Sequence, residues 1–237
     1  MNRQFVPKLL RSLLVAAVFC APSAWAEDED LVKARELVAE AQFTIERILA
    51  DDKMGKAARA QFRSAKAVLI VPSMLKAGLI LAGEGGSGVL LAKADTGEWS
   101  YPAFYSVGSG SVGLQLGAQK SELLLFIMTG KGLEIILDGS GTVGGELNAA
   151  VGTFGETREA ATTVNFGPDI VSIGVNDGAF IGASVEGAIV FSNASRNAAF
   201  YGNEDAVPEA VVLRGEFANA DADALREQLT KLTAFRN

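Results

Sequence analysis

Side chains that could carry out catalysis are scarce in this sequence. The chain contains no histidine, and Cys20 is its one cysteine. A serine or cysteine nucleophile would lack its usual imidazole base, and zinc would lack its usual ligands. Carboxylates could form an acid–base pair or bind Ca²⁺, but none has the spacing of a calcium loop; the candidates are Glu84, Asp95, Glu98, Asp138 and Glu146. We predict a protein that is not an enzyme, with no catalytic residue, no metal site and no cofactor.

Two glycine-rich segments, residues 83–88 and 108–113, match the G-x-G-x-x-G pattern of dinucleotide-binding proteins. That site needs a helix directly after the glycines, so that the helix N-terminus faces the pyrophosphate. Both segments run instead into sequence typical of strands. We therefore predict that these glycines serve turns and strands rather than a nucleotide.

Five basic residues recur three or four positions apart and share one face of a helix predicted over 51–64. We call them the basic ridge: Lys53, Lys56, Arg59, Arg63 and Lys66. Apolar residues fall on a different side of the same segment: Met54, Ala58, Phe62 and Ala65. The ridge is either an ordinary solvated helix face or a docking surface for anionic lipid head groups. The chain as a whole carries a net charge of −7, which argues against nucleic acid as a partner.

Aromatic residues cluster around Pro102, namely Trp99, Tyr101, Phe104 and Tyr105. One interpretation is an aromatic corner that packs the core where strands meet. The other is an apolar pocket or a membrane interface, where Trp and Tyr are favoured. The sequence favours the first interpretation.

The first 26 residues have the pattern of a secretory signal peptide. Basic residues precede an apolar run over 9–21, which is too short to span a bilayer, and Ala24-Trp25-Ala26 offers a cleavage site. We expect export across an inner membrane to a periplasmic or envelope location. Cys20 could mark a lipoprotein, but Phe19 beside it favours simple cleavage.

The remaining chain, 27–237, predicts one α+β domain. Helices are expected over 30–50, 51–64, 132–137, 210–213 and from 221 onward, from their apolar periodicity. Strands are expected over 67–72, 79–81, 88–92, 112–118, 122–129, 142–153, 161–165, 169–175 and 179–191. We predict N-terminal helices over 27–66, a twisted, mostly antiparallel, glycine-rich β core over 67–202, barrel- or sandwich-like, and a helical tail over 203–237.

An ordered set of short motifs resembles the SYLF domain, the Las17-binding, actin-regulator-like family. The motifs lie at 65–72, 76–79, 85–89, 99–104, 113–117, 178–182, 184–187 and 197–202. The resemblance implies a lipid-binding module whose eukaryotic members bind phosphoinositide-rich membranes through a basic N-terminal segment, and some of which engage actin. It suggests a secreted bacterial member.

Taken together, these patterns predict a non-catalytic protein that binds phospholipid at a membrane surface of the cell envelope, through the basic ridge. The alternative is a protein-interaction or structural component of the envelope that uses its β core as a platform for a protein partner.

Overall fold

The computed structural model describes residues 28–78, 81–112, 117–139, 141–142, 149–151, 168–176, 179–181 and 188–234. The predicted signal peptide and Cys20 lie outside these residues. The helices are α1 (Glu29–Ala50), α2 (Asp52–Ser64), α3 (Gly130–Leu137), α4 (Ala194–Tyr201), α5 (Pro208–Val212) and α6 (Asp223–Ala234), with a 3₁₀ turn η1 (Ala220–Ala222). The strands are β1 (Ala67–Gly78), β2 (Leu81–Ala92), β3 (Ala103–Val112), β4 (Gly117–Ile127), β5 (Gly141–Thr142), β6 (Ala149–Val151), β7 (Ile170–Asn176), β8 (Ala179–Ile181) and β9 (Ile189–Ser192).

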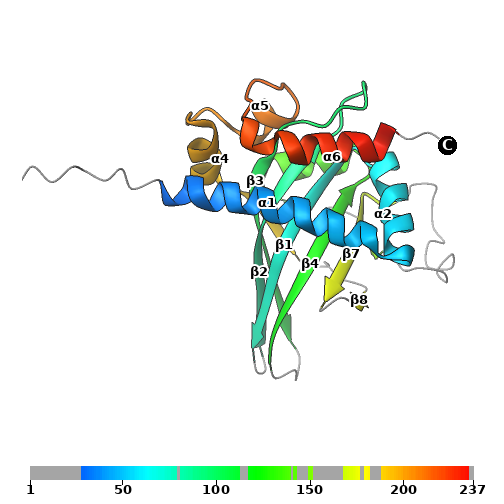
Figure 1. Ribbon diagram of the computed structural model, residues 1–237. Helices are drawn as coiled ribbons and strands as arrows, with labels where there is room; N and C mark the ends of the chain where they lie inside the picture. The colour runs from blue at the N-terminus through cyan, green and yellow to red at the C-terminus, as the bar shows by residue number, and fades with distance from the viewer. Residues whose placement is uncertain are drawn as a thin grey trace, which may run out of the picture.

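The described strands form one sheet in the order β5-β9-β3-β2-β1-β4-β7-β6, with β8 paired to β7. The pairs are antiparallel except for β6 and β7, which run parallel. The predicted α+β class and mostly antiparallel sheet are confirmed. Barrel-like or sandwich-like closure is wrong, because helices rather than a second sheet cover the faces of this open sheet (Figure 1).

Each face of the sheet carries its own apolar core. On one face, α1, α2, α4 and α6 pack on alternate residues of the central strands, and the large buried side chains there include Ile45, Phe62, Ile70, Leu91, Phe104 and Phe126. On the other face, α3 and α5 pack on the intervening residues, including Leu69, Leu90, Tyr105, Leu125 and Ile127. The alternation follows from the two-residue period of a strand.

The turn between α1 and α2 is fixed by an acidic cap. The carboxylate of Asp51 accepts a hydrogen bond of 2.8 Å from the backbone N–H of Met54, as an N-cap residue does. The backbone N–H of Gly55 also donates to the carbonyl of Asp51. A Cβ atom at Gly55 would lie 2.7 Å from the carbonyl oxygen of Leu49, so glycine lets α2 begin close against the end of α1.

Strand β1 contains a bulge, and glycines of β2 fit against it. The pairing between β1 and β2 shifts register between Ile70 and Ser73. A Cβ at Gly88 would lie 2.6 Å from the carbonyl oxygen of Ile70, and one at Gly86 would lie 2.5 Å from that of Ser73. The predicted strand at 88–92 is therefore part of the longer β2, because the glycines before it continue the pairing instead of ending it. Of the strand predicted over 79–81, Leu81 begins β2 and residues 79–80 lie outside the described residues. Strand β3 was missed for the same reason: its 103–112 segment contains a Gly-Ser-Gly run.

The buried phenol of Tyr105 makes no hydrogen bond in the described structure, and its burial raises its pKa above the ordinary value. We expect Tyr105→Phe to raise the free energy of unfolding by about 1 kcal/mol, because it removes an unsatisfied polar group. The raised pKa means that the wild type loses stability as the pH rises above about 10, and the variant should lose less. Urea unfolding at neutral and alkaline pH measures both effects. A less stable variant would show that the hydroxyl has a partner.

Candidate functional site

Helix α2 buries its apolar side and exposes most of its basic side. Met54, Ala58 and Phe62 are buried in the core beneath α1 and α6, and the ring of Phe62 meets that of Phe126 edge-to-face at 4.9 Å. Of the basic ridge, the side chains of Lys56, Arg63 and Lys66 are exposed. Lys53 belongs to the same helix, and its side chain lies outside the described part of the structure. Because the apolar side is already packed, α2 can meet another surface only through its charges.

Arg59 and Lys66 show how the protein fixes α2 against α1 and the sheet. The guanidinium of Arg59 is half-buried and donates a hydrogen bond of 3.3 Å to the carbonyl of Leu49 at the end of α1. Lys66 lies past the end of α2, and its backbone N–H donates to the carbonyl of Ile127 at 2.8 Å. The backbone of Lys66 is therefore fixed by the sheet, and the guanidinium of Arg59 is partly engaged by the end of α1. Three exposed charges remain well placed for contact with an external anion.

A further cation, Lys93, lies beside the ridge and was not predicted from the sequence. Its ammonium donates to the carbonyls of Phe62 and Arg63, at 3.2 and 2.7 Å, and so caps the end of α2. Burial of its ammonium lowers the pKa of Lys93 below the ordinary value, and the positive charge of Lys66 lowers it further. Lys93 also lies 5.7 Å from the centre of the Trp99 ring. Only the pairing of β1 with β2 brings it here, so residue spacing carried no signal for it.

The exposed ridge residues Lys56, Arg63 and Lys66 make no ion pair with any described residue, although the described part of the chain contains several such pairs elsewhere. Lys33 of α1 and Lys231 of α6, for example, are each paired with a glutamate one turn earlier. Among the described residues, these three positive charges are therefore uncompensated on an acidic protein, which is the arrangement that attracts an anionic surface.

The four aromatic residues predicted to share a corner or a pocket are divided between the two faces of the sheet. Trp99 and Phe104 are buried in the core beneath α1 and α6, and Tyr105 is buried in the opposite core. The Trp99 indole N–H donates to the hydroxyl of Thr233 at 3.3 Å. Three of the four are therefore buried in the cores of the protein, as the first interpretation expects, and the pocket or interface interpretation stays a prediction.

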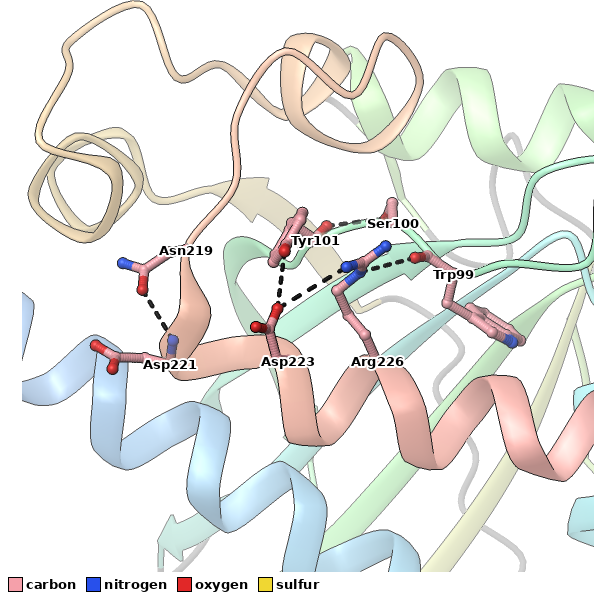
Figure 2. Close-up of polar contacts among 7 residues, drawn as sticks. All are labelled: Trp99, Ser100, Tyr101, Asn219, Asp221, Asp223 and Arg226. Carbon is pink, nitrogen blue, oxygen red and sulfur yellow. Dashed lines mark hydrogen bonds and ion pairs between the residues drawn. The ribbon is translucent and has the colours of Figure 1, made fainter.

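The fourth, Tyr101, belongs to a clasp that fastens α6 to the segment before β3 (Figure 2). Arg226 stacks its guanidinium 3.9 Å from the centre of the Tyr101 ring and donates to the carbonyl of Trp99 at 2.9 Å. The Tyr101 hydroxyl donates to the carboxylate of Asp223 at 2.8 Å, a bond that raises the pKa of Tyr101. The partners of Tyr101 are within the protein, which indicates a structural role.

A buried carboxylate under α1 forms a second polar cluster. Glu122 of β4 is 9% exposed; it accepts a hydrogen bond of 3.0 Å from the Thr44 hydroxyl and pairs with Arg47. We expect Arg47→Met to lower the free energy of unfolding by about 2 kcal/mol, because it leaves a buried charge without its cation. Adding Glu122→Gln should recover part of that loss in urea unfolding. Equal stability of wild type and Arg47→Met would show that the ion pair contributes nothing.

Neither a metal centre nor a membrane span is present in the described part of the chain. Within these residues, no group of three or more His, Cys, Asp or Glu is arranged to hold a metal ion. None of the described helices combines the length and apolar character that crossing a bilayer requires.

The fold and the exposed basic side chains on and just after α2 define a single-sheet α+β protein that presents a basic helix. Residues 108–232 match the Ysc84 family, described as Las17-binding protein actin regulator. The chain is 28% identical over 166 residues to SH3 domain-containing YSC84-like protein 1 of Xenopus laevis, covering 70% of this chain and 50% of that protein. It is 30% identical over 134 residues to the Bos taurus protein of the same name, covering 56% and 39%. It is 28% identical over 144 residues to LAS seventeen-binding protein 3 of Saccharomyces cerevisiae, covering 60% and 31%.

This chain belongs to the Ysc84 family, and the resemblance to the SYLF domain is confirmed. It spans about half, or less, of the length of the curated relatives it matches. Two of those relatives carry the SH3 domain in their names, and the third is named for binding Las17.

Proposed function

We propose that this protein is a non-catalytic phospholipid-binding module that docks on anionic membrane surfaces through α2, in the cell envelope. The observation that carries the proposal is the exposed charge of Lys56, Arg63 and Lys66, which form no ion pair with a described residue, on and just after a helix whose apolar side is packed in the core. Each cation near an anionic membrane is worth about 1 kcal/mol. The three together supply roughly 3 kcal/mol, which corresponds to about a 150-fold gain in affinity for an anionic surface.

This mode of docking differs from that of an amphipathic helix that inserts into the bilayer. An inserting helix must bury its own apolar face among lipids, whereas Phe62 and Ala58 are fully buried in the protein. Docking through α2 is therefore electrostatic, and it should weaken as salt shortens the screening length.

The test is flotation of the purified chain with vesicles of phosphatidylcholine, with and without phosphatidylglycerol. We expect binding only with the anionic lipid, and loss of that binding between about 0.1 M and 1 M salt, where the Debye length falls from about 10 to 3 Å. Equal binding to both vesicles at both salt concentrations would overturn the proposal.

The second candidate function is docking of a protein partner, and the family description favours it because it names Las17 binding. An acidic protein segment could meet the same ridge, or a partner could use the sheet as a platform. Pull-down from an envelope extract freed of lipid distinguishes the two. Capture of one defined partner that persists without lipid and competes with vesicles would favour the protein-interaction function.

A further inference from the structure

Exposed apolar side chains gather on one flank of the molecule, away from the basic ridge. In the described part of the chain, six large apolar side chains are markedly exposed, and four of them share this flank: Phe43 at 64%, Leu75 at 57%, Ile189 at 51% and Phe191 at 47%. Phe43 lies on α1. Leu75 lies on β1, and Ile189 and Phe191 lie on β9. Figure 1 shows that the ends of β1, β2 and β4 extend past α1 without a helix across them.

The strand register places these side chains on one face. Directly opposed residues of antiparallel strands point to the same side of a sheet. Leu75 pairs with Gly85 and with Lys120. Gly85 pairs with Gly108, which in turn pairs with Ile189. Phe191 pairs with Ser106. This is the face of the sheet on which α1 lies, so these apolar side chains lie beside that helix.

A hollow of about 590 Å³ lies beside two of them, Leu75 and Phe191. Its walls are Leu37 and Glu40 of α1, with Leu75 and Phe191, and its floor is made by serines and glycines of β1, β2 and β3. The floor is free of side chains at two positions. A Cβ atom at Gly85 or Gly108 would meet only a carbonyl oxygen, at 3.9 and 3.8 Å. A hollow of this size with apolar walls suits a small ligand rather than water alone.

A second hollow, of about 350 Å³, continues along the same flank and shares Glu40 with the first. Phe43, Pro72 and Val175 give it apolar walls, and its charged residues are Glu40, Arg47, Lys120 and Glu122. Arg47 pairs with Glu122. Exposed Lys120 and exposed Glu40 make no ion pair with described residues and carry opposite charges. A ligand that matches both hollows is therefore an apolar chain with a head group bearing both charges.

We propose that these two hollows bind one phospholipid of the ethanolamine class, with an acyl chain over Gly85 and Gly108 and the head group at the α1 flank. There its phosphate would meet Lys120 and Arg47, and its ammonium would meet Glu40. The site is separate from the basic ridge, and it rests on the proposed function only in that the chain must encounter phospholipid.

Calorimetric titration with lysophosphatidylethanolamine below its micelle concentration tests this site. Gly85→Leu with Gly108→Leu should weaken binding at least about tenfold, because the leucines displace several methylenes of the chain. The matched control is Gly83→Leu, two residues along the same strand, where a Cβ meets nothing within 4 Å; it should change the affinity by less than about twofold. A second variant, Leu75→Ser with Phe191→Ser, should also weaken binding because it removes apolar walls of the same hollow. Unlike the leucine variant, it adds no side-chain volume.

The head group is tested separately. Glu40→Gln should remove the preference for lysophosphatidylethanolamine over lysophosphatidylcholine, whose methylated ammonium cannot donate a hydrogen bond. Reversing the charge of Lys56, Arg63 and Lys66 should leave this titration unchanged, so failure of the ridge and failure of the hollow are distinguishable. Unaltered affinity in the Gly85/Gly108 variant would overturn the site. The site would also be overturned if the wild type dimerised without lipid and the variant Leu75→Ser with Phe191→Ser did not. A second copy of the chain would then cover this face.

Discussion

Reversing three charges, in the variant Lys56→Glu/Arg63→Glu/Lys66→Glu, is expected to abolish binding to anionic vesicles. Removing three favourable cations costs roughly 3 kcal/mol, or about a 150-fold loss of affinity, and the added carboxylates repel the surface further. The fold should persist, because all three side chains are exposed and none forms an ion pair with a described residue. Flotation across a range of phosphatidylglycerol contents, with circular dichroism as a check on folding, measures the effect.

The matched control carries the same change of charge elsewhere: Lys33→Glu, Arg214→Glu and Lys231→Glu. These exposed residues lie in α1, after α5 and in α6, and each is paired with glutamate. We expect this control to keep most of its binding, because only net charge at a distance has changed. A similar loss in both variants would mean that overall charge, and not the ridge, governs docking.

Gly88→Val is expected to lower the free energy of unfolding by about 3 kcal/mol or more, because the added side chain overpacks the sheet where two strands meet most closely. A Cβ at this position would lie 2.6 Å from the carbonyl oxygen of Ile70 and 2.9 Å from a methyl carbon of Val71. The first of these contacts is with backbone, so relief requires the bulge in β1 to move. Urea unfolding of the purified variant measures the loss.

Gly83→Val is the matched control for this position. It lies in the same strand, and a Cβ there meets nothing within 4 Å. Because valine favours a strand more than glycine does, we expect the control to be as stable as the wild type or slightly more stable. If Gly83→Val destabilised the protein as much as Gly88→Val, the loss would come from the backbone freedom of glycine and not from the close approach at the bulge.

The helices were predictable because their cause is local. The apolar stripe of α1 and that of α2 recur every three or four residues, and these residues are the ones buried against the sheet. The predicted bounds 30–50 and 51–64 differ from those observed by one residue at the start. The turn at 94–97 has an equally local cause, since Gly97 has a φ of 89°, in the region that favours glycine.

The glycine-rich strands were not predictable from local pattern. Gly85, Gly86 and Gly88 have no side chain to alternate between faces, so the sequence reads there as turns. The role of Gly86 and Gly88 emerges only when β2 lies against the bulge of β1. The segment predicted as one strand over 179–191 contains two strands, β8 and β9, which pair with different partners.

The candidate site was partly predictable. The spacing of Lys56 and Arg63 indicated a shared exposed face, and the structure places both there. That spacing could not show that Arg59 braces the end of α1, or that Lys93, just past the end of β2 and about thirty residues further along the chain, caps α2. The hollows under α1 depend on the register of β1, β2, β3 and β9, which no short-range pattern encodes.

The central claim, that α2 is the surface that meets the membrane, is tested most directly by a fluorophore at one thiol. In a Cys20→Ser background, Ser64→Cys places the label at the exposed end of α2, between Arg63 and Lys66. Glu204→Cys places it at an exposed position between α4 and α5, two helices that Figure 1 shows away from α2. With phosphatidylglycerol vesicles that carry a head-group quencher, we expect the label at residue 64 to be quenched and the label at 204 to remain bright. Quenching at 204 with none at 64 would contradict docking through α2.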